Sequence, residues 1–171
     1  MEFDSLPFSS AADRATLYSA RWYGPDEGVL LLVSCQGEVF ATLNVGFVKS
    51  LRAGPHLAGA SVTAFLTVTP GGGTGHELER LLLVARAGDR LTVGLSELTY
   101  ERDESMPLRE GNEKVSRLRF SAGYDTLELT SVEARFRRNS VTDSIAVRVE
   151  TARTVSKRCW IEARVAFLDC Q

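Results

Sequence analysis

The chain has two histidines, His56 and His76, and both lie in stretches rich in glycine. Histidine is the side chain that most often binds metal ions or moves protons near neutral pH. Neither histidine has a second histidine, a cysteine or an aspartate at the spacing of a zinc site. We therefore expect no metal and no cofactor, and we keep the two histidines as candidates for a small-ligand site on loops.

A run of glycines lies between a strand-like segment at 61–69 and His76. Strand, glycine loop and helix is the order of a phosphate-binding loop, in which backbone N–H groups hold the anion. The position of the P-loop lysine is occupied by His76, and the acidic residues Glu77 and Glu79 follow. The glycines therefore predict a flexible turn at 70–75 rather than a phosphate site.

Nucleophiles and carboxylates are present without the neighbours that catalysis requires. The chain has no Gly-x-Ser-x-Gly segment. Asp103 and Glu104 are adjacent, but they lie in a charged stretch, whereas acid–base catalysis needs carboxylates that a rigid element positions. We infer a protein that is not an enzyme. An enzyme or small-ligand protein that uses loops 53–60 and 70–76 is the alternative.

The three cysteines, Cys35, Cys159 and Cys170, show no metal-binding spacing and no Cys-x-x-Cys pair. An odd number of cysteines fits a reducing compartment. The first twelve residues contain Glu2 and Asp4 and no basic residue, unlike a secretory signal. These features predict a cytoplasmic or other reducing intracellular location rather than secretion. We expect Cys35 and Cys159 to be buried in strands and Cys170 to be reactive at the chain end.

The best candidate for a binding surface is a group of arginines, Arg135, Arg137 and Arg138, with Trp160 on a neighbouring segment. Arginine and tryptophan carry much of the binding energy at interfaces, because each buries a large planar group and keeps polar contacts. These four residues predict a surface for a protein partner or for self-association. Alternation turns Trp160 away from Cys159, so the indole lies either under another part of the chain or at an interface.

Other interpretations of the arginines stay open. Cross-strand Arg–Glu pairs would leave a solvated, self-paired surface, and the acidic residues expected on the same faces are Glu128, Glu133, Glu150 and Glu162. The net charge of −2 lacks the basic excess of a nucleic-acid-binding domain, so nucleic acid is the weakest alternative. The longest apolar run, Val29 to Val33, is far too short to span a membrane, and we expect no membrane contact.

The elements that position these residues are β-strands, because apolar residues recur at every second position. Strands are expected at 15–23, 28–35, 38–44, 61–69, 115–120, 127–138, 145–150 and 158–168. The apolar phase slips near 130–131 and again after Leu95, and a β-bulge at each place would restore it. The segment 76–85 fits a helix and a strand equally well. Long loops are expected at 53–60, 70–75 and 101–114.

The 171 residues fit a single domain over the whole chain, 1–171, in which residues 1–12 are a flexible N-terminal segment. We predict an all-β fold: an antiparallel β-sandwich or jelly roll of about eight to ten strands, with at most one or two short helices. The predicted function is a non-enzymatic intracellular module that binds proteins or self-assembles. A viral-type jelly-roll shell or nucleic-acid-associated subunit is a further alternative, against which the lack of a basic N-terminal arm counts.

Overall fold

The computed structural model of the chain describes residues 2–9, 14–21, 28–70, 72–73, 75–88, 90–105, 109–139 and 144–170. These described residues form 13 strands and one 3-10 helix, η1 (Glu162–Arg164). The strands are β1 (Glu2–Ser9), β2 (Arg14–Arg21), β3 (Gly28–Ser34), β4 (Val39–Val45), β5 (Phe47–Ala53), β6 (Val62–Thr69), β7 (Gly72–Gly73), β8 (His76–Ala87), β9 (Arg90–Ser105), β10 (Glu110–Phe120), β11 (Thr126–Arg138), β12 (Ile145–Ile161) and β13 (Ala166–Asp169).

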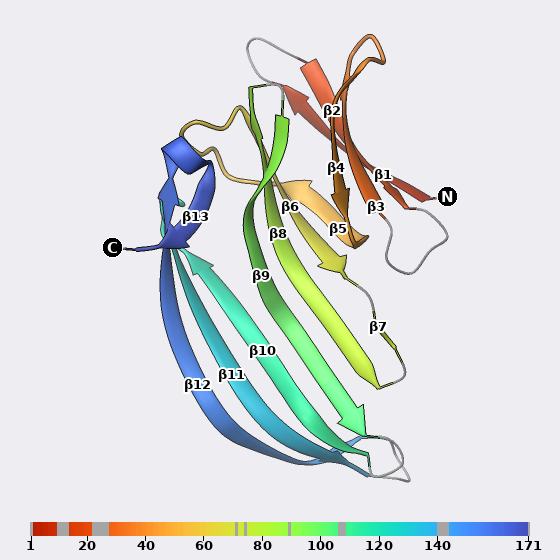
Figure 1. The fold of residues 1–171 in the computed structure, drawn as a ribbon, viewed down its shortest axis with the longest axis vertical. Helices are drawn as coiled ribbons and strands as arrows, with labels where there is room; N and C mark the ends of the chain where they lie inside the picture. The colour runs from red at the N-terminus through yellow and green to blue at the C-terminus, as the bar shows by residue number, and fades with distance from the viewer. Residues whose placement is uncertain are drawn as a thin grey trace.

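The strands form two antiparallel sheets (Figure 1). The smaller sheet has the order β1-β2-β3-β4, and the larger has the order β13-β12-β11-β10-β9-β8-β6-β5, with β7 paired to β8. The predicted all-β, antiparallel sandwich is confirmed, with more strands than the eight to ten expected. Strands adjacent in space follow one another in sequence, so the connectivity is that of a meander, whereas a jelly roll contains two Greek keys.

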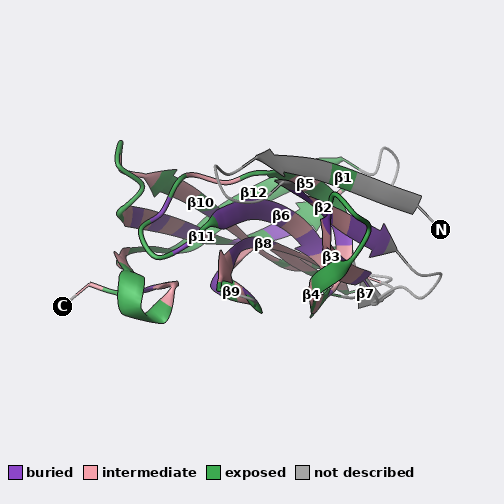
Figure 2. Cartoon of the chain, turned by 90° about the horizontal axis from the view of Figure 1, so that it is seen from above, coloured by how far each residue is buried: buried purple, intermediate pink, exposed green. Residues whose placement is uncertain are grey.

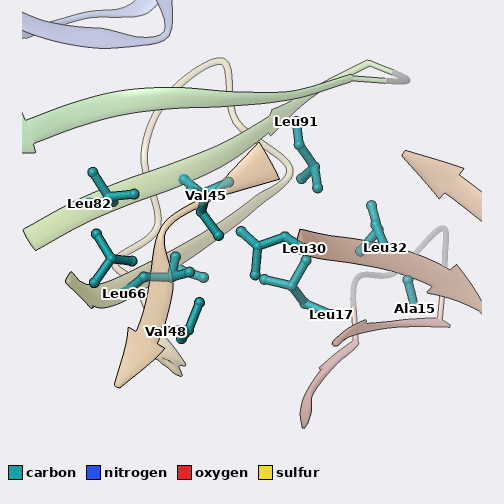
Figure 3. Close-up of a cluster of buried hydrophobic side chains, with 12 residues drawn as sticks. Ala15, Leu17, Leu30, Leu32, Val45, Val48, Leu66, Leu82 and Leu91 are labelled. Atoms are coloured by element: carbon teal, nitrogen blue, oxygen red, sulfur yellow. The ribbon is translucent and has the colours of Figure 1, made fainter. Parts of the chain in front are cut away.

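A first core lies between the two sheets (Figure 3). Leu17 and Leu30 of the small sheet face Leu66 and Leu82 of the large sheet, and all four are buried. The segment 81–85 is buried at every position, because successive side chains of β8 enter different cores. A strand covered on both faces has a continuous apolar run instead of an alternating one. The open choice at 76–85 is therefore settled in favour of a strand.

The chain crosses from the small sheet to the large one at Gly46, the single residue between β4 and β5. A Cβ atom at Gly46 would lie 2.9 Å from the carbonyl oxygen of Thr69, closer than such contacts occur. The corner therefore requires glycine, because the backbone of β6 approaches it directly.

The large sheet forks in the middle. Strands β9 and β10 pair only over Tyr100–Ser105 and Glu110–Val115, and beyond these residues the two strands diverge (Figure 1). A second core fills the fork between the arms, and its members are Leu57, Ala60, Phe65, Leu81, Leu83, Ala85, Leu95, Leu127 and Phe167. Figure 2 shows buried residues concentrated along β6, which lies between the two cores. The predicted loop at 53–60 is confirmed, and it closes the fork with Leu57 and Ala60.

Two sequence-based expectations for the C-terminal half are wrong. Most of the charged stretch 101–114 is not a loop, since residues 101–105 and 110–114 extend strands β9 and β10, while residues 106–108 lie outside the described part of the chain. The expected strand 158–168 is interrupted by η1 and folds back as a hairpin, in which Trp160 pairs with Phe167 across β12 and β13. The interruption puts these two aromatic side chains on one face, which simple alternation could not predict.

The change in the apolar alternation near residues 130–131 is not caused by a β-bulge in β11, as the sequence suggested. Strand β11 pairs with β10 without interruption, so β11 contains no bulge there. The extra residue is Thr151 of β12, opposite the Glu133–Ala134 step. Burial along β11 changes face between Ser131 and Ala134, because the long strand borders the second core at one end only. The change in apolar alternation after Leu95 does coincide with irregularities in β9, where Gly94 and Thr99 are extra residues relative to β8.

The cysteines also differ from expectation. Cys159 and Cys170 form a disulfide across the β12–β13 hairpin, with 5.0 Å between their Cα atoms. Cys35 is free and exposed in the turn after β3. The predictions of a reactive Cys170 and a buried Cys35 are therefore wrong. Strand β3 ends at Ser34, one residue before Cys35, so the cysteine lies beyond the buried part of the strand.

Candidate protein-binding surface

Strand β12 is exposed on both faces along most of its length. All residues from Ile145 to Lys157 are exposed, and β12 has β11 as its neighbour on one side. On the other side β13 pairs only with Arg158–Ile161. Among the described strands, none pairs with this side of β12 over 145–157, which at about 3.3 Å per residue is an edge roughly 40 Å long.

Exposed valines on this strand lie directly across from two of the candidate arginines. Arg135 pairs with Val149 and Arg137 pairs with Val147 in the β11–β12 register. Directly opposed residues on antiparallel strands share a face of the sheet. Val147 and Val149 are 54% and 56% exposed, and both arginines are exposed. We call these four residues, Arg135, Arg137, Val147 and Val149, the Arg–Val face.

The arginines of the Arg–Val face form few ion pairs with other described residues of the chain. Arg137 lies 3.5 Å from the carboxylate of Glu110, and both side chains are more than half exposed. Arg135 makes no ion pair with any described residue, and its cross-strand neighbours are Asn112 and Val149. An exposed pair of this kind contributes little to stability, so these arginines are available to a partner.

Arg138 lies apart from the other two arginines. Its Nε donates a 3.0 Å hydrogen bond to the carboxylate of Glu104, and the two side chains are only 14% and 11% exposed. Its guanidinium also lies over the ring of Phe136, 5.8 Å from the centroid. Arg138 therefore joins β11 to β9 within the chain, which matches the self-paired interpretation rather than the partner-binding one.

Trp160 is placed at the far end of the sheet from the arginines. Its Nε1 donates to the carbonyl oxygen of Ala58 at 2.9 Å, and its ring meets that of Phe167 edge-on, with 5.3 Å between centroids. About 30 Å of strand separates it from Arg135, at the usual rise per residue. The structure therefore does not bring the four predicted residues together, and Trp160 packs under the 54–61 loop of its own chain.

The two candidate histidines also lie apart. His56 is exposed on the loop between β5 and β6, and His76 begins β8 after the glycine turn. The two loops leave opposite ends of β6, which spans roughly 25 Å at the strand rise. The expected ligand loops therefore do not form one joint site.

His76 lines a shallow hollow of about 340 Å³. Its other lining residues include Lys49, Glu79 and Tyr100, and Lys49 forms a 3.1 Å ion pair with Glu79. Burial raises the pKa of Tyr100 above its ordinary value, with smaller effects from Arg102, which lowers it, and from Glu113, which raises it. No group of three or more His, Cys, Asp or Glu residues in the described part of the chain is placed to hold a metal ion.

Sequence reasoning missed the exposed valines. The alternation of Ile145, Val147 and Val149 predicts a strand with these residues on a core, and the strand is present. Its apolar face is nevertheless exposed, because β12 lies beyond the edge of both cores. Arg148 and Glu150 occupy the other face, so the local pattern is that of a half-buried strand and contains no signal that the valines are exposed.

No helix in the described ranges is long and apolar enough to cross a membrane. Comparison of the chain with known protein families, with curated proteins and with solved structures finds no match.

Proposed function

We propose that the chain is a non-enzymatic protein-binding module whose contact surface is the Arg–Val face. The observation that carries the proposal is the direct cross-strand alignment of two exposed arginines with two exposed valines. Large apolar side chains grouped on a surface mark interaction sites. Arginine is enriched at interfaces because its flat guanidinium packs on apolar groups and still makes hydrogen bonds.

The strand on which the arginines lie supports the same proposal. Strand β11 is paired by β10 over Leu127–Arg137 on one side and by β12 over Thr126–Arg138 on the other. Residues held in a continuous ladder lose little further conformational entropy when a partner binds. The Arg–Val face is therefore a preorganised platform rather than a mobile loop.

The proposal includes an intracellular reducing compartment, and the oxidation state of the cysteines tests that location. In such a compartment Cys159 and Cys170 would be two thiols, whereas the structure joins them in a disulfide. Rapid alkylation of thiols in material from the native source, followed by mass spectrometry, decides between the two states. Alkylated Cys159 and Cys170 would support the reducing compartment, and an intact bond would exclude it.

The test of the Arg–Val face uses two variants that change its chemistry in different ways. Arg135→Glu with Arg137→Glu reverses the charge, and Val147→Thr with Val149→Thr removes apolar surface while keeping β-branched shape. Proteins from a native extract that the wild-type chain retains are quantified for each variant by mass spectrometry. We expect both variants to lose the same partner while the melting temperature stays unchanged, since all four side chains are exposed.

Matched controls lie on neighbouring positions of the same sheet. Arg117→Glu with Arg119→Glu changes two exposed arginines at the same spacing on β10, and Val155→Thr changes a valine of β12 that is 60% exposed. The controls should retain the partner. A partner that both face variants retain, or that the controls lose equally, would place the site elsewhere on the chain.

A further inference from the structure

We propose that a second copy of this chain binds along the free edge of β12, so that the two β12 strands pair antiparallel about a two-fold axis at Val149. This inference names one partner for the module proposed above and rests on that proposal for its biological meaning. Its starting observation is different, because it concerns the edge of the sheet rather than the Arg–Val face. The exposed edge at 145–157 carries backbone donors and acceptors that no described strand pairs.

An unpaired, exposed strand edge with apolar side chains is a template for pairing with another strand. The edge of β12 combines length with exposed apolar residues, among them Ile145, Val147, Val149 and Val155. Addition of a strand there would satisfy free N–H and C=O groups in a ladder centred on Val147–Glu150, the stretch between the extra residues Ala146 and Thr151 of β12. The charged side chains of β12 determine which partner strand can pair with this edge.

The pattern of charges matches β12 to itself. A two-fold axis perpendicular to the sheet keeps each side chain on its own face, so it must pass through a residue position. With the axis at Val149, Arg148 of each copy lies opposite Glu150 of the other copy, and the two Val149 side chains meet. Opposite charges and paired β-branched side chains at directly opposed positions stabilise antiparallel strands.

The neighbouring registers are unfavourable for the same reason. An axis at Arg148 would place the two Arg148 side chains opposite each other, and an axis at Glu150 would oppose the two glutamates. Like charges directly opposite each other destabilise a strand pair. The sequence Val147-Arg148-Val149-Glu150 thus favours one register and disfavours the registers one step to either side.

The chain's own ion pairs are compatible with this arrangement. Arg148 reaches Glu113 at 2.8 Å and remains 41% exposed, and Glu150 bonds Arg153 at 3.0 Å with both side chains exposed. Each of these groups has further hydrogen-bonding capacity for a second partner. The Val147 and Val149 side chains of the two copies would lie side by side on one face, which doubles the apolar part of the Arg–Val face.

The experiment measures the association of the purified full chain by sedimentation velocity over a range of concentrations. Arg148→Glu places glutamate opposite Glu150 of the second copy, and Glu150→Arg places two arginines in opposition. We expect each single variant to weaken the dimer by about tenfold or more, because two favourable pairs become two repulsive ones. The double variant, Arg148→Glu with Glu150→Arg, should restore dimerisation.

Mixing the two single variants is the sharpest arm of the test. One copy then carries two acidic residues and the other two basic residues at these positions, so the mixed dimer is complementary although neither variant pairs with itself. Thermal melting of each variant checks that the fold is intact, and Arg117→Glu on β10 is the matched charge-reversal control that should dimerise like the wild type. If Arg148→Glu alone fails to fold, Glu150→Arg and the double variant still carry the test.

Several outcomes would overturn the inference. A wild-type chain that stays monomeric at all concentrations would do so, as would single variants that dimerise like the wild type or a mixture that does not associate. The Arg135→Glu, Arg137→Glu variant separates this inference from the proposed function, because these arginines lie one strand away from the edge. It should dimerise normally and lose only the extract partner. If the wild-type chain does not dimerise but the Arg135→Glu, Arg137→Glu variant still loses the extract partner, the edge pairing is rejected and the proposed function is supported.

Discussion

The indole Nε1 of Trp160 donates a hydrogen bond to the carbonyl oxygen of Ala58, 102 residues earlier in the chain and 2.9 Å away. This bond fastens the 54–61 loop over the fork of the large sheet. Leu57 and Ala60 of the same loop are buried in the second core, against which Trp160 also packs. The tryptophan that sequence reasoning assigned to a partner surface therefore closes the molecule's own interior.

Replacement of Trp160 should separate the packing of the ring from its hydrogen bond. Trp160→Ala removes the ring contact with Phe167 and should lower the free energy of unfolding by about 3 kcal/mol. Trp160→Phe keeps an aromatic ring and loses the bond to Ala58, which should cost about 1 kcal/mol. Urea unfolding measures both values. Equal stability of Trp160→Ala and the wild type would mean that the loop is not held by this residue.

Gly94 should not tolerate a side chain. A Cβ atom there would lie 2.8 Å from the carbonyl oxygen of Val165 and 3.2 Å from the ring of Trp160. Gly94→Ala should therefore lower the free energy of unfolding by about 1–3 kcal/mol, as overpacking does. Gly123→Ala is the control, because the nearest atom to its Cβ lies 3.9 Å away. A Gly94→Ala protein as stable as the Gly123→Ala protein would contradict the close approach of Val165 and Trp160 to β9.

Two glutamates that each pair with an arginine of β11 should differ in their effect on stability. Glu104→Gln weakens a pair with Arg138 that is largely buried, and should cost about 2 kcal/mol. Glu110→Gln weakens a pair with Arg137 that is mostly exposed, and should cost less than about 0.5 kcal/mol. Thermal or urea unfolding of the two variants compares them directly. Equal costs would show that burial does not distinguish the two pairs.

The cysteines should differ in reactivity and in their effect on stability. In the oxidised protein a thiol reagent should label Cys35 and leave Cys159 and Cys170 unlabelled, since these two share a disulfide. The bond closes a short loop of sequence separation 11, and its removal by Cys159→Ser with Cys170→Ser should cost about 3 kcal/mol. Cys35→Ser is the control and should leave unfolding unchanged. Labelling of all three cysteines in oxidised protein would contradict the pairing.

Stability should fall at alkaline pH partly through Tyr100. Burial raises the pKa of Tyr100 above its ordinary value of 10.0, so the folded chain holds the phenol proton more tightly than the unfolded chain does. The resulting stability is fully present below pH 10 and is lost as the pH rises through the pKa of the folded state. Tyr100→Phe should therefore show a shallower alkaline loss of stability than the wild type. Parallel curves for the two proteins would mean that Tyr100 ionises alike in both states.

The all-β class and most strand positions could be predicted from local alternation, because a strand with one buried face records that burial in every second residue. The loop at 53–60 could be predicted in the same way from its glycines and proline. The strand at 81–85 could not be distinguished from a helix, since burial on both faces removes the alternation. The strand residues at 101–105 and 110–114 were hidden by their charges, which form ion pairs with other strands, such as that of Glu104 with Arg138 of β11.

The candidate surface shows the same division. The sequence by itself determined that Arg135 and Arg137 lie on an outward face of a strand and that 145–150 forms another strand. Only the tertiary structure decided that Val147 and Val149 lie beside those arginines, because the β11–β12 register depends on an extra residue in β12. It also decided that these valines are exposed while the equally apolar Leu82 and Val84 are buried. Local pattern specifies which residues share a face, but burial of that face depends on the position of the strand in the sheet, and β12 is outside both cores.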